Sequence, residues 1–215
     1  MLRLYTYFRS SAAFRVRIAL HYKRLSYESI PVHLLRGGGE QHAAAFAERN
    51  PARLIPVLED GALKLTQSLA IIEYLDEMHP TPALLPADAA GRAAVRALAL
   101  SIACDIHPLN NTRVLRYLKN ELAIDEQQRD AWARHWIALG FSALERVLAE
   151  GGMAGCCCYG DTPTLADCCL IPQVFNALRV QCPLEPYPTI HAIHQHCMRL
   201  PAFERAAPAA QGDAE

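Results

Sequence analysis

The sequence predicts two domains of different fold class, an α/β domain over residues 1–80 and an all-helical domain over residues 89–215. Short strand-like runs alternate with helical patterns through the first part, whereas the alanine-rich remainder carries only helical periodicity. A short, proline-rich linker over residues 81–88 separates the two patterns. We therefore expect a small sheet domain followed by a helical one.

The first strand-like run, residues 2–7, leads directly into the apolar helical pattern of residues 11–20. The first N–H groups of such a helix lack intrahelical partners, and together with the positive end of the helix dipole they favour an anion. Ser10 and Ser11 stand at this turn as N-cap candidates, and each also has a hydroxyl that can donate. A plain helix cap is the commonest use of such serines. The elements that follow must therefore decide whether this turn only caps the helix or also binds an anion.

Residues 27–32 form the second predicted strand, parallel to the first across the helical crossover. The glycine-rich loop over residues 35–42 leads into a short helix over residues 43–48. This loop lacks the spacing of a phosphate-binding loop, so we assign it no nucleotide.

Two short strands at residues 57–58 and 63–65 flank an Asp-Gly turn, which is a strong hairpin signal. Pro56 directly precedes the first of them, where a cis bond is one way to make the sharp entry. Residues 66–68 are expected to cap a helix with an apolar face. The order β-α-β-α-β-β-α is that of a thioredoxin-like domain.

Two long helices are expected in the second domain, each with an apolar face at helical spacing. The face of the first comprises Val95, Leu98, Ile102 and Ile106. The face of the second, which we expect to lie in the core, comprises Trp132, Trp136, Leu139, Ala143 and Val147. Pro108 should bend or break the first helix because it removes a backbone donor.

The formal net charge of −1 and the pI near 6.7 give no electrostatic footprint for nucleic acid. No apolar run is long enough to cross a bilayer, and the first residues lack the pattern of a signal peptide. Eight cysteines without an export signal favour reduced thiols. These features predict a soluble, cytoplasmic protein with neither a nucleic-acid nor a membrane partner.

The cysteines and histidines of the last third are interpreted as structural, and no metal site is expected. Residues 156–158 are three consecutive cysteines without Cys-x-x-Cys spacing, and buried cysteine behaves as a small apolar residue. Residues 191–197 hold three histidines and a cysteine, which an exposed helix face explains as well as a metal does. Thr164 and Asp167 form a capping-box pair, and residues 208–215 are expected to be a loose tail.

These features together resemble the zeta-class glutathione transferases, the class of maleylacetoacetate isomerase and its bacterial relative maleylpyruvate isomerase. The segments that carry the resemblance are residues 8–11, 15–20, 50–51, 55–57, 67–75 and 80–86. The resemblance continues into the last third of the chain. It implies the glutathione transferase fold, glutathione as cofactor, a homodimer and a place in aromatic amino-acid catabolism.

The chain departs from the class pattern at two positions of the serine turn. Ala12 stands where the class usually has cysteine, and Phe14 where tryptophan is common. Alanine can be neither a nucleophile nor a disulfide partner. The thiol of glutathione must therefore carry the chemistry, and a thiol-disulfide oxidoreductase is disfavoured.

The resemblance also implies the roles of individual residues. Ser11 is the first choice and Ser10 the second for supporting the glutathione thiolate, with Arg9 beside them. The residues implied in glutathione binding are Gln41, His42, Ile55, Pro56, Gln67, Ser68 and, from a neighbouring subunit, His107. The residues proposed to hold the substrate are Arg9, Arg179, Arg113 and Asn111. Arginine suits a carboxylate because its planar fork can bind both oxygens.

The leading functional hypothesis is a glutathione-dependent cis-trans isomerase of a maleyl keto-acid, either maleylacetoacetate or maleylpyruvate. Thiolate addition to the alkene, rotation about the resulting single bond and elimination would perform the isomerisation. One alternative is a broad-specificity transferase acting on α-halo acids or other electrophiles. Another is a non-catalytic scaffold that binds glutathione.

Overall fold

The computed structural model describes all residues from 1 to 215, which divide into two compact units. The first unit comprises Met1–Leu84 and Met198–Glu215, and the second comprises Leu85–Cys197. The C-terminal segment thus lies in the first unit, whereas the sequence placed all of residues 89–215 in the helical domain. No helix combines the length and the apolar character that crossing a membrane requires.

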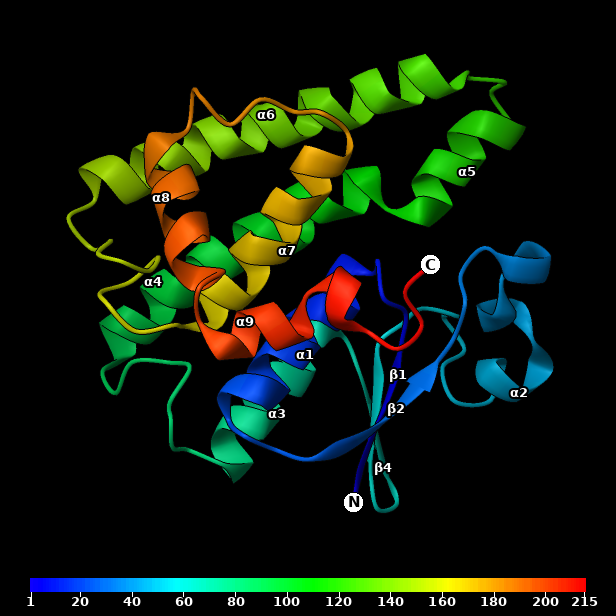
Figure 1. The fold of residues 1–215 in the computed structure, drawn as a ribbon, viewed down its shortest axis with the longest axis horizontal. Coiled ribbons are helices and arrows are strands. Elements are labelled where there is room, and N and C mark those ends of the chain that lie inside the picture. The colour runs from blue at the N-terminus through cyan, green and yellow to red at the C-terminus, as the bar shows by residue number, and fades with distance from the viewer. The chain divides into compact units, whose positions relative to one another are not determined.

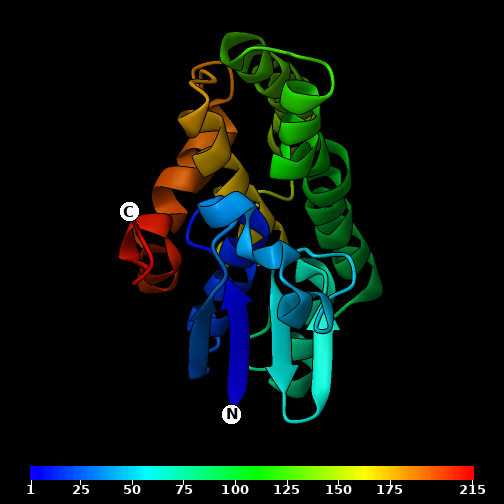
Figure 2. The same ribbon diagram turned by 90° about the vertical axis from the view of Figure 1, so that its right-hand side faces the viewer.

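The first unit contains one four-stranded mixed sheet of order β2-β1-β3-β4 (Figure 2). Its strands are β1 (Leu2–Thr6), β2 (Tyr27–Pro31), β3 (Val57–Asp60) and β4 (Leu63–Thr66). β1 pairs in parallel with β2 and antiparallel with β3, and β3 and β4 form the predicted hairpin. Leu4 and Leu58 lie opposite each other and are fully buried. The predicted thioredoxin-like order is confirmed.

The helices of the first unit are α1 (Ser11–Tyr22), α2 (Ala44–Ala47), α3 (Ser68–Met78) and α9 (Pro201–Ala206). The remaining helical turns of this unit are short 3₁₀ segments at Arg36–Gly38, Glu40–His42 and Pro208–Ala210. α1 packs against both α3 and α9 (Figure 1). The unit therefore buries α1 between sheet and helices.

Arg17 ties α1 to its surroundings from within the core, where its side chain is fully buried. Its Nε donates to the carbonyl of Ala206, and its Nη2 donates to the carbonyl of Phe8. Its Nη1 donates to Thr6 Oγ1 and to the carbonyl of Tyr7. Burial lowers the pKa of Arg17 to about 10, so the guanidinium stays charged at neutral pH.

The last residues are not the loose tail that the sequence suggested. Asp213 Oδ2 accepts the backbone N–H of Phe8 at 3.0 Å. The carboxylate of Glu215 pairs with Arg36 at 2.6 Å, which lowers the pKa of that carboxyl. Two carboxylates therefore attach the chain end to the first unit, and composition alone could not reveal these long-range contacts.

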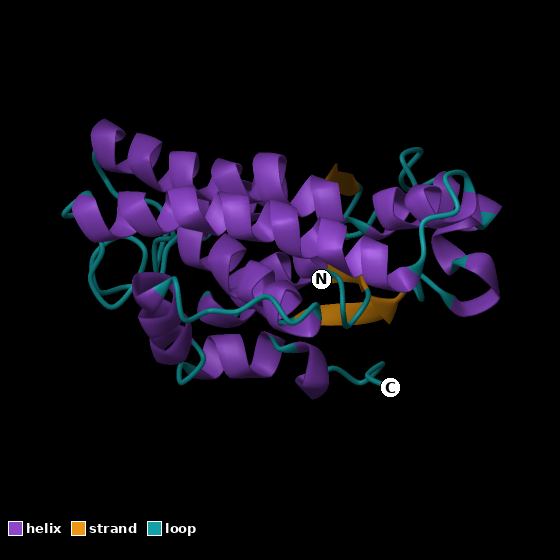
Figure 3. Cartoon of the chain, turned by 90° about the horizontal axis from the view of Figure 1, so that it is seen from above, coloured by secondary structure: helices purple, strands orange, loops and turns teal.

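All the regular elements of the second unit are helices, and Figure 3 shows that helices predominate in the chain. Its α-helices are α4 (Ala89–Leu100), α5 (Thr112–Asn120), α6 (Glu126–Glu150), α7 (Leu165–Arg179) and α8 (Pro188–Cys197). A π-helical segment, η3 (Ser101–Ile106), and a 3₁₀ turn, η4 (His107–Asn110), connect α4 to α5. The predicted break at Pro108 is confirmed.

The apolar face predicted for the first long helix is buried, from Val95 in α4 to Ile106 in η3. The face predicted for α6 is wrong. The buried residues of this helix are Ala133, Ile137, Phe141, Leu144 and Leu148. Leu139 and Val147, expected in the core, are 59% and 47% exposed. α6 has two neighbouring apolar stripes. The stripe that is buried in the core is the one without the two tryptophans.

Candidate active site

The register of the sheet brings the starts of two helices to one edge. Val57, the first residue of β3, lies opposite Tyr5 near the end of β1 and opposite Thr66 at the end of β4. β1 leads into α1 and β4 leads into α3, so both helices begin at the edge where β3 starts. The segments implied in binding glutathione, at residues 10–11, 55–56 and 67–68, therefore converge.

Ser10 is the N-cap of α1, and Ser11 is its first residue. The Oγ of Ser10 accepts the N–H of Ala13 at 3.2 Å, while its backbone N–H donates to the carbonyl of Tyr7. Ser11 is 8% exposed. The cap therefore occupies a lone pair of the Ser10 hydroxyl, and no acidic side chain in the first turn competes for the helix dipole.

Arg9 is exposed beside this turn, and aromatic rings hold its position. Its Nη2 donates to the Tyr7 hydroxyl at 3.2 Å. Its guanidinium carbon lies 5.3 Å from the centre of the Phe8 ring, within the range of a cation–π contact. Arg9 thus places a positive charge next to the serine turn while leaving donors for an anion.

The peptide bond between Ile55 and Pro56 is cis, as the entry to β3 suggested. Both residues are buried. Their position immediately before β3 sets their backbone at the edge where α1 begins.

The start of α3 lacks the side-chain cap that the sequence predicted for residues 66–68. Gln67 holds the N-cap position with φ of 69° and makes no capping hydrogen bond. Its positive φ lies outside the extended conformation that capping residues usually adopt. Ser68 is 6% exposed, and its Oγ accepts a hydrogen bond from Arg15 Nη1 at 3.3 Å. The first N–H groups of α3 therefore remain available to an anion.

Gln41 and His42 lie on the 3₁₀ turn that follows the glycine-rich loop. Gln41 is buried and lies 3.1 Å from His42 Nε2 through its amide nitrogen, whereas its Oε1 has no hydrogen-bond partner. Gly39 has φ of 113°, and a Cβ there would lie 2.5 Å from the Gln41 amide. The positive φ favours glycine at this position, and the Cβ of another residue would displace the end of the Gln41 side chain.

In the second unit, Asn111 and His107 lie together where η4 meets α5. The Asn111 side chain caps α5 by accepting the N–H of Arg113 at 3.0 Å. Its amide nitrogen lies 3.4 Å from His107 Nε2. Arg113 is exposed. The structure therefore gives Asn111 a capping role beside any role in binding.

Arg179, at the end of α7, belongs to a hydrogen-bonded chain that the sequence did not reveal. Its Nη2 donates to Asn176 Oδ1 at 2.9 Å, and Asn176 Nδ2 donates to Asn110 Oδ1 at 2.7 Å. Asn110 in turn donates to the carbonyl of Ile106. Arg179 is exposed, whereas both asparagines are buried. An asparagine three residues before an arginine, in an apolar helix, was the available signal.

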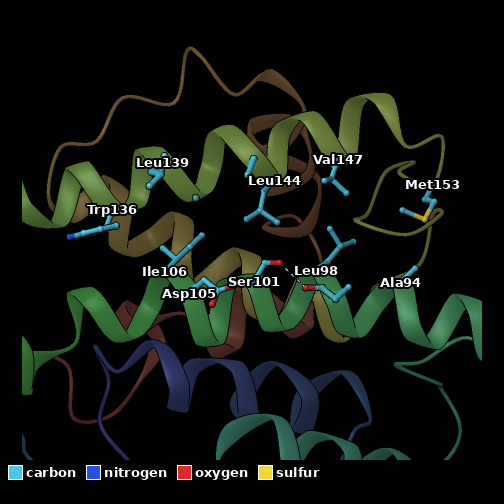
Figure 4. Close-up of a pocket in the computed structure, with 13 residues that line it drawn as sticks. Ala94, Leu98, Ser101, Asp105, Ile106, Trp136, Leu139, Leu144, Val147 and Met153 are labelled. Carbon is cyan, nitrogen blue, oxygen red and sulfur yellow. Dashed lines mark hydrogen bonds between the residues drawn. The ribbon is translucent and has the colours of Figure 1, made fainter.

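A cavity of about 530 Å³ lies within the second unit, lined by α4, η3, α6 and Met153 (Figure 4). Its lining is almost entirely apolar, with Ser101 and Asp105 as the polar exceptions. Ser101 already donates to the carbonyl of Ala97, as the dashed line in Figure 4 marks. None of the predicted site residues lines this cavity, and its walls do not suit a substrate with carboxylates.

Asp167 is the centre of the predicted capping box at the start of α7. Its Oδ2 accepts both the N–H and the hydroxyl of Thr164, and its Oδ1 accepts the N–H of Cys158. Burial raises the pKa of this carboxyl, and these hydrogen bonds oppose the rise. The carboxylate of Asp167 therefore stabilises the start of α7 through these hydrogen bonds.

The cysteine run divides by exposure, with Cys156 outside and Cys157 and Cys158 buried. Ligand atoms of Cys157, Asp167 and Cys197 lie within 4.8 Å of one another. The Asp167 oxygens are already engaged in capping, so we keep the metal-free interpretation as a prediction.

On α8, His191 Nε2 lies 3.2 Å from Gln195 Nε2. Burial lowers the pKa of His194, and the nearby His191 lowers it further.

We expect only Cys104 and Cys156 to react with a chromogenic aromatic disulfide in the folded protein at neutral pH, because the other six thiols are buried. Burial raises the pKa of Cys158, and hydrogen bonding to Cys157 together with burial raises that of Cys197. Unfolding should release the remaining thiols. Elemental analysis should find no stoichiometric zinc. Reaction of more than two thiols with the reagent before unfolding would contradict the assignment of the other six cysteines to the core.

Comparison with known proteins identifies relatives along the whole chain. Residues 4–83 match the model of the glutathione S-transferase N-terminal domain. A probable maleylacetoacetate isomerase of Vibrio cholerae is 54% identical over 98% of this chain and 97% of its own length. A maleylpyruvate isomerase of a Ralstonia species is 52% identical over 99% of both chains.

A solved holo structure of a maleylpyruvate isomerase, a bacterial zeta-class glutathione S-transferase, superposes with a TM-score of 0.96. It is 52% identical and covers 99% of this chain and 100% of its own. The sheet edge, the serine turn at the start of α1 and this similarity over the full length lead to one conclusion. The chain belongs to the zeta-class glutathione transferase family, together with the maleylacetoacetate and maleylpyruvate isomerases.

Proposed function

We propose that this protein is a glutathione-dependent cis-trans isomerase of a maleyl keto-acid, either maleylacetoacetate or maleylpyruvate. The observation that carries the proposal is the convergence of the starts of α1 and α3 with residues 55–56 at one sheet edge. The relatives that are 54% and 52% identical, a probable maleylacetoacetate isomerase and a maleylpyruvate isomerase, support it. A solved maleylacetoacetate isomerase of Anaeromyxobacter dehalogenans, 46% identical, has glutathione bound in its active site.

The groups at this edge fit glutathione, which has an anionic carboxylate at each end and a thiol between them. Two helix starts without acidic residues in their first turns supply donors for anions. We assign the γ-glutamyl end to Gln67 and Ser68, the cysteinyl backbone to Ile55 beside Pro56, and the glycine end to the Gln41–His42 turn. When bound, glutathione supplies the thiolate that adds to the alkene and leaves after rotation.

The task of the serine turn is to stabilise the thiolate anion. The helix dipole and a serine hydroxyl both favour a negative charge, so they lower the pKa of a thiol held there. We assign this role to Ser11, the first residue of α1, as the family resemblance implies, and Ser10 stays the second choice because accepting the Ala13 N–H leaves its hydroxyl hydrogen free to donate.

Arg9 and Arg179 hold the carboxylates of the substrate. Arg9 keeps free donors beside the serine turn, and Asn176 fixes Arg179 from the buried side of α7. Arg113 and Asn111 complete the substrate contacts, and we keep His107 as a residue that reaches the neighbouring subunit's glutathione. A charge-assisted contact of this kind discriminates between an anionic and a neutral substrate.

The chemistry of an α-halo acid transferase would need only the activated thiolate, and a scaffold would need only binding. An α-halo acid also has a carboxylate, so Arg179 would suit either substrate, and we favour isomerisation because the relatives that are 54% and 52% identical are named as isomerases. Turnover of halo acids without maleyl isomerisation would favour the transferase instead. Binding of glutathione without turnover of either substrate class would favour the scaffold.

Isomerisation should depend completely on glutathione, because the serine turn has alanine at position 12 and therefore no protein thiol. The measurement is steady-state turnover of both maleyl substrates with and without glutathione, and it also decides between them. A small nucleophilic thiol without the γ-glutamyl and glycine ends serves as the control. Turnover that persists after complete removal of glutathione would disprove the mechanism.

Ser11→Ala should lower kcat/KM by more than about tenfold, roughly 1.4 kcal/mol, because it removes the hydroxyl that stabilises the thiolate. Ser10→Ala is the matched control at the neighbouring position and should lower kcat/KM less, while reducing helix stability by about 1 kcal/mol. Negligible losses of activity in both variants would mean that backbone N–H groups alone hold the thiolate.

Arg179→Ala and Arg9→Ala should each reduce isomerisation of the maleyl acid about ten- to a hundredfold relative to conjugation of a neutral electrophile. The neutral electrophile uses the same thiolate but has no carboxylate to hold. Arg146→Ala, on an exposed part of α6, serves as the control and should leave the ratio unchanged. If both activities fall together in Arg179→Ala, the carboxylate contact lies elsewhere.

We also propose that a second copy of the chain covers the outer apolar stripe of α6. Leu139 and Val147 on this helix and Leu100 on α4 are each at least 45% exposed. Large contiguous apolar patches on a protein surface mark interaction sites, and we infer that these side chains belong to one. The eight thiols fit a reducing compartment, and we propose a cytoplasmic location.

Leu139→Asp should therefore convert a dimer into monomers, because it places a charge in the covered stripe. Sedimentation equilibrium measures the mass of the particle directly. Leu122→Asp is the control, since Leu122 is 54% exposed but does not line the cavity between α4 and α6. A monomeric parent protein, or a Leu139→Asp variant that remains dimeric, would contradict this proposal.

A further inference from the structure

Arg15 is a buried cation whose charge the protein does not neutralise. Its side chain lies on α1 and is 2% exposed. Its Nη1 donates to Ser68 Oγ at 3.3 Å, which is a long hydrogen bond, whereas Nε and Nη2 have no hydrogen-bond partner. Removing a guanidinium from water without an anion or a full set of acceptors is unfavourable.

The other buried cations of the first unit show how this chain usually satisfies such groups. Arg17, two residues along α1, donates to three carbonyls and a hydroxyl. Lys23 pairs with Asp76 at 2.6 Å and donates to the carbonyls of His79 and Pro82. Arg15 has neither an acidic partner nor a carbonyl. Its environment is therefore incomplete in a way that theirs is not.

The one group that Arg15 contacts is at the start of α3, where a second set of donors is unused. Ser68 is the first residue of this helix, and no side chain caps it. Because the Ser68 oxygen accepts the hydrogen bond from Arg15, the hydroxyl hydrogen of Ser68 is left to donate elsewhere. Figure 1 shows α1 and α3 side by side, so a buried guanidinium and an open helix start meet at this point.

We propose that Arg15 is the counter-cation of a carboxylate bound at the start of α3. It acts by its charge and by orienting the Ser68 hydroxyl toward the ligand, so it is a positioning residue and not a catalytic one. Resting on the proposed function, the ligand group is the α-carboxylate at the γ-glutamyl end of glutathione. That carboxylate supplies the negative charge that the environment of Arg15 lacks.

The arrangement has a consequence for affinity. A hydrogen bond from the guanidinium polarises the serine hydroxyl and strengthens the bond that this hydroxyl makes to an anion. The contribution of Arg15 should therefore disappear when the ligand has no carboxylate at this position. A residue that only supports the fold would affect both kinds of ligand equally.

The test is a cycle of two ligands and several variants, with dissociation constants from titration calorimetry. The ligands are glutathione and 4-aminobutanoyl-cysteinylglycine, which has the same skeleton without the α-carboxylate. The parent protein should bind glutathione at least about tenfold more tightly than the analogue, and Arg15→Met should bind the two within about twofold. Ser68→Ala should reduce the same ratio, and Arg15→Lys, which keeps the charge, should retain part of it.

Arg49→Met is the matched control, because Arg49 is a partly buried arginine of the same unit that bonds to Tyr5 and Glu59. It should leave the ratio of the two affinities unchanged. Equal weakening of both ligands in Arg15→Met would overturn the proposal and assign Arg15 to the fold. A parent protein that binds glutathione without preferring it to the analogue would also overturn it. A parent protein that binds neither ligand would instead overturn the proposed function.

Discussion

The pairing of β3 with β1 is the constraint on which the rest of the site depends. Because Val57 lies opposite Tyr5 and Thr66, one sheet edge receives the end of β1, the start of β3 and the end of β4. A slip of one residue between β1 and β3 would put the buried Leu4 and Leu58 on opposite faces of the sheet, so the core fixes this register. The same register therefore determines both the packing of the unit and the convergence of two helix starts.

Two arginines of α1 have different roles: Arg17 stabilises the packing of the first unit, and we propose that Arg15 stabilises a bound ligand. Arg17 donates to the Thr6 hydroxyl at the end of β1, to the carbonyls of the following turn and to a carbonyl of α9, and thereby fixes the chain just before the serines. Arg15 bonds only to Ser68 and leaves donors unmatched. The hydrogen bonds of Arg17 are satisfied within the protein, whereas those of Arg15 are not. A bound anion can therefore gain electrostatic stabilisation from Arg15.

Much of this organisation follows from local sequence signals. The Asp60-Gly61 turn predicts the hairpin, and Thr164 with Asp167 predicts the start of α7. The phase of α6 could not be predicted, because two apolar stripes lie next to each other and only tertiary packing selects one. The Asn176–Asn110 pair joins residues 66 positions apart, which no periodicity reveals. The attachment of the chain end through Asp213 was hidden for the same reason.

The central claim is that the start of α1 stabilises the thiolate of bound glutathione. It is tested most directly by the pH titration of that thiol, followed by the far-ultraviolet absorbance of the thiolate as a difference between liganded and free protein. The buried cysteines should not interfere, because burial raises the pKa of Cys158 and of Cys182. We expect the bound thiol to titrate at least about one unit below the ordinary value of about 8.5. A bound thiol that titrates at the value of free glutathione would contradict the account.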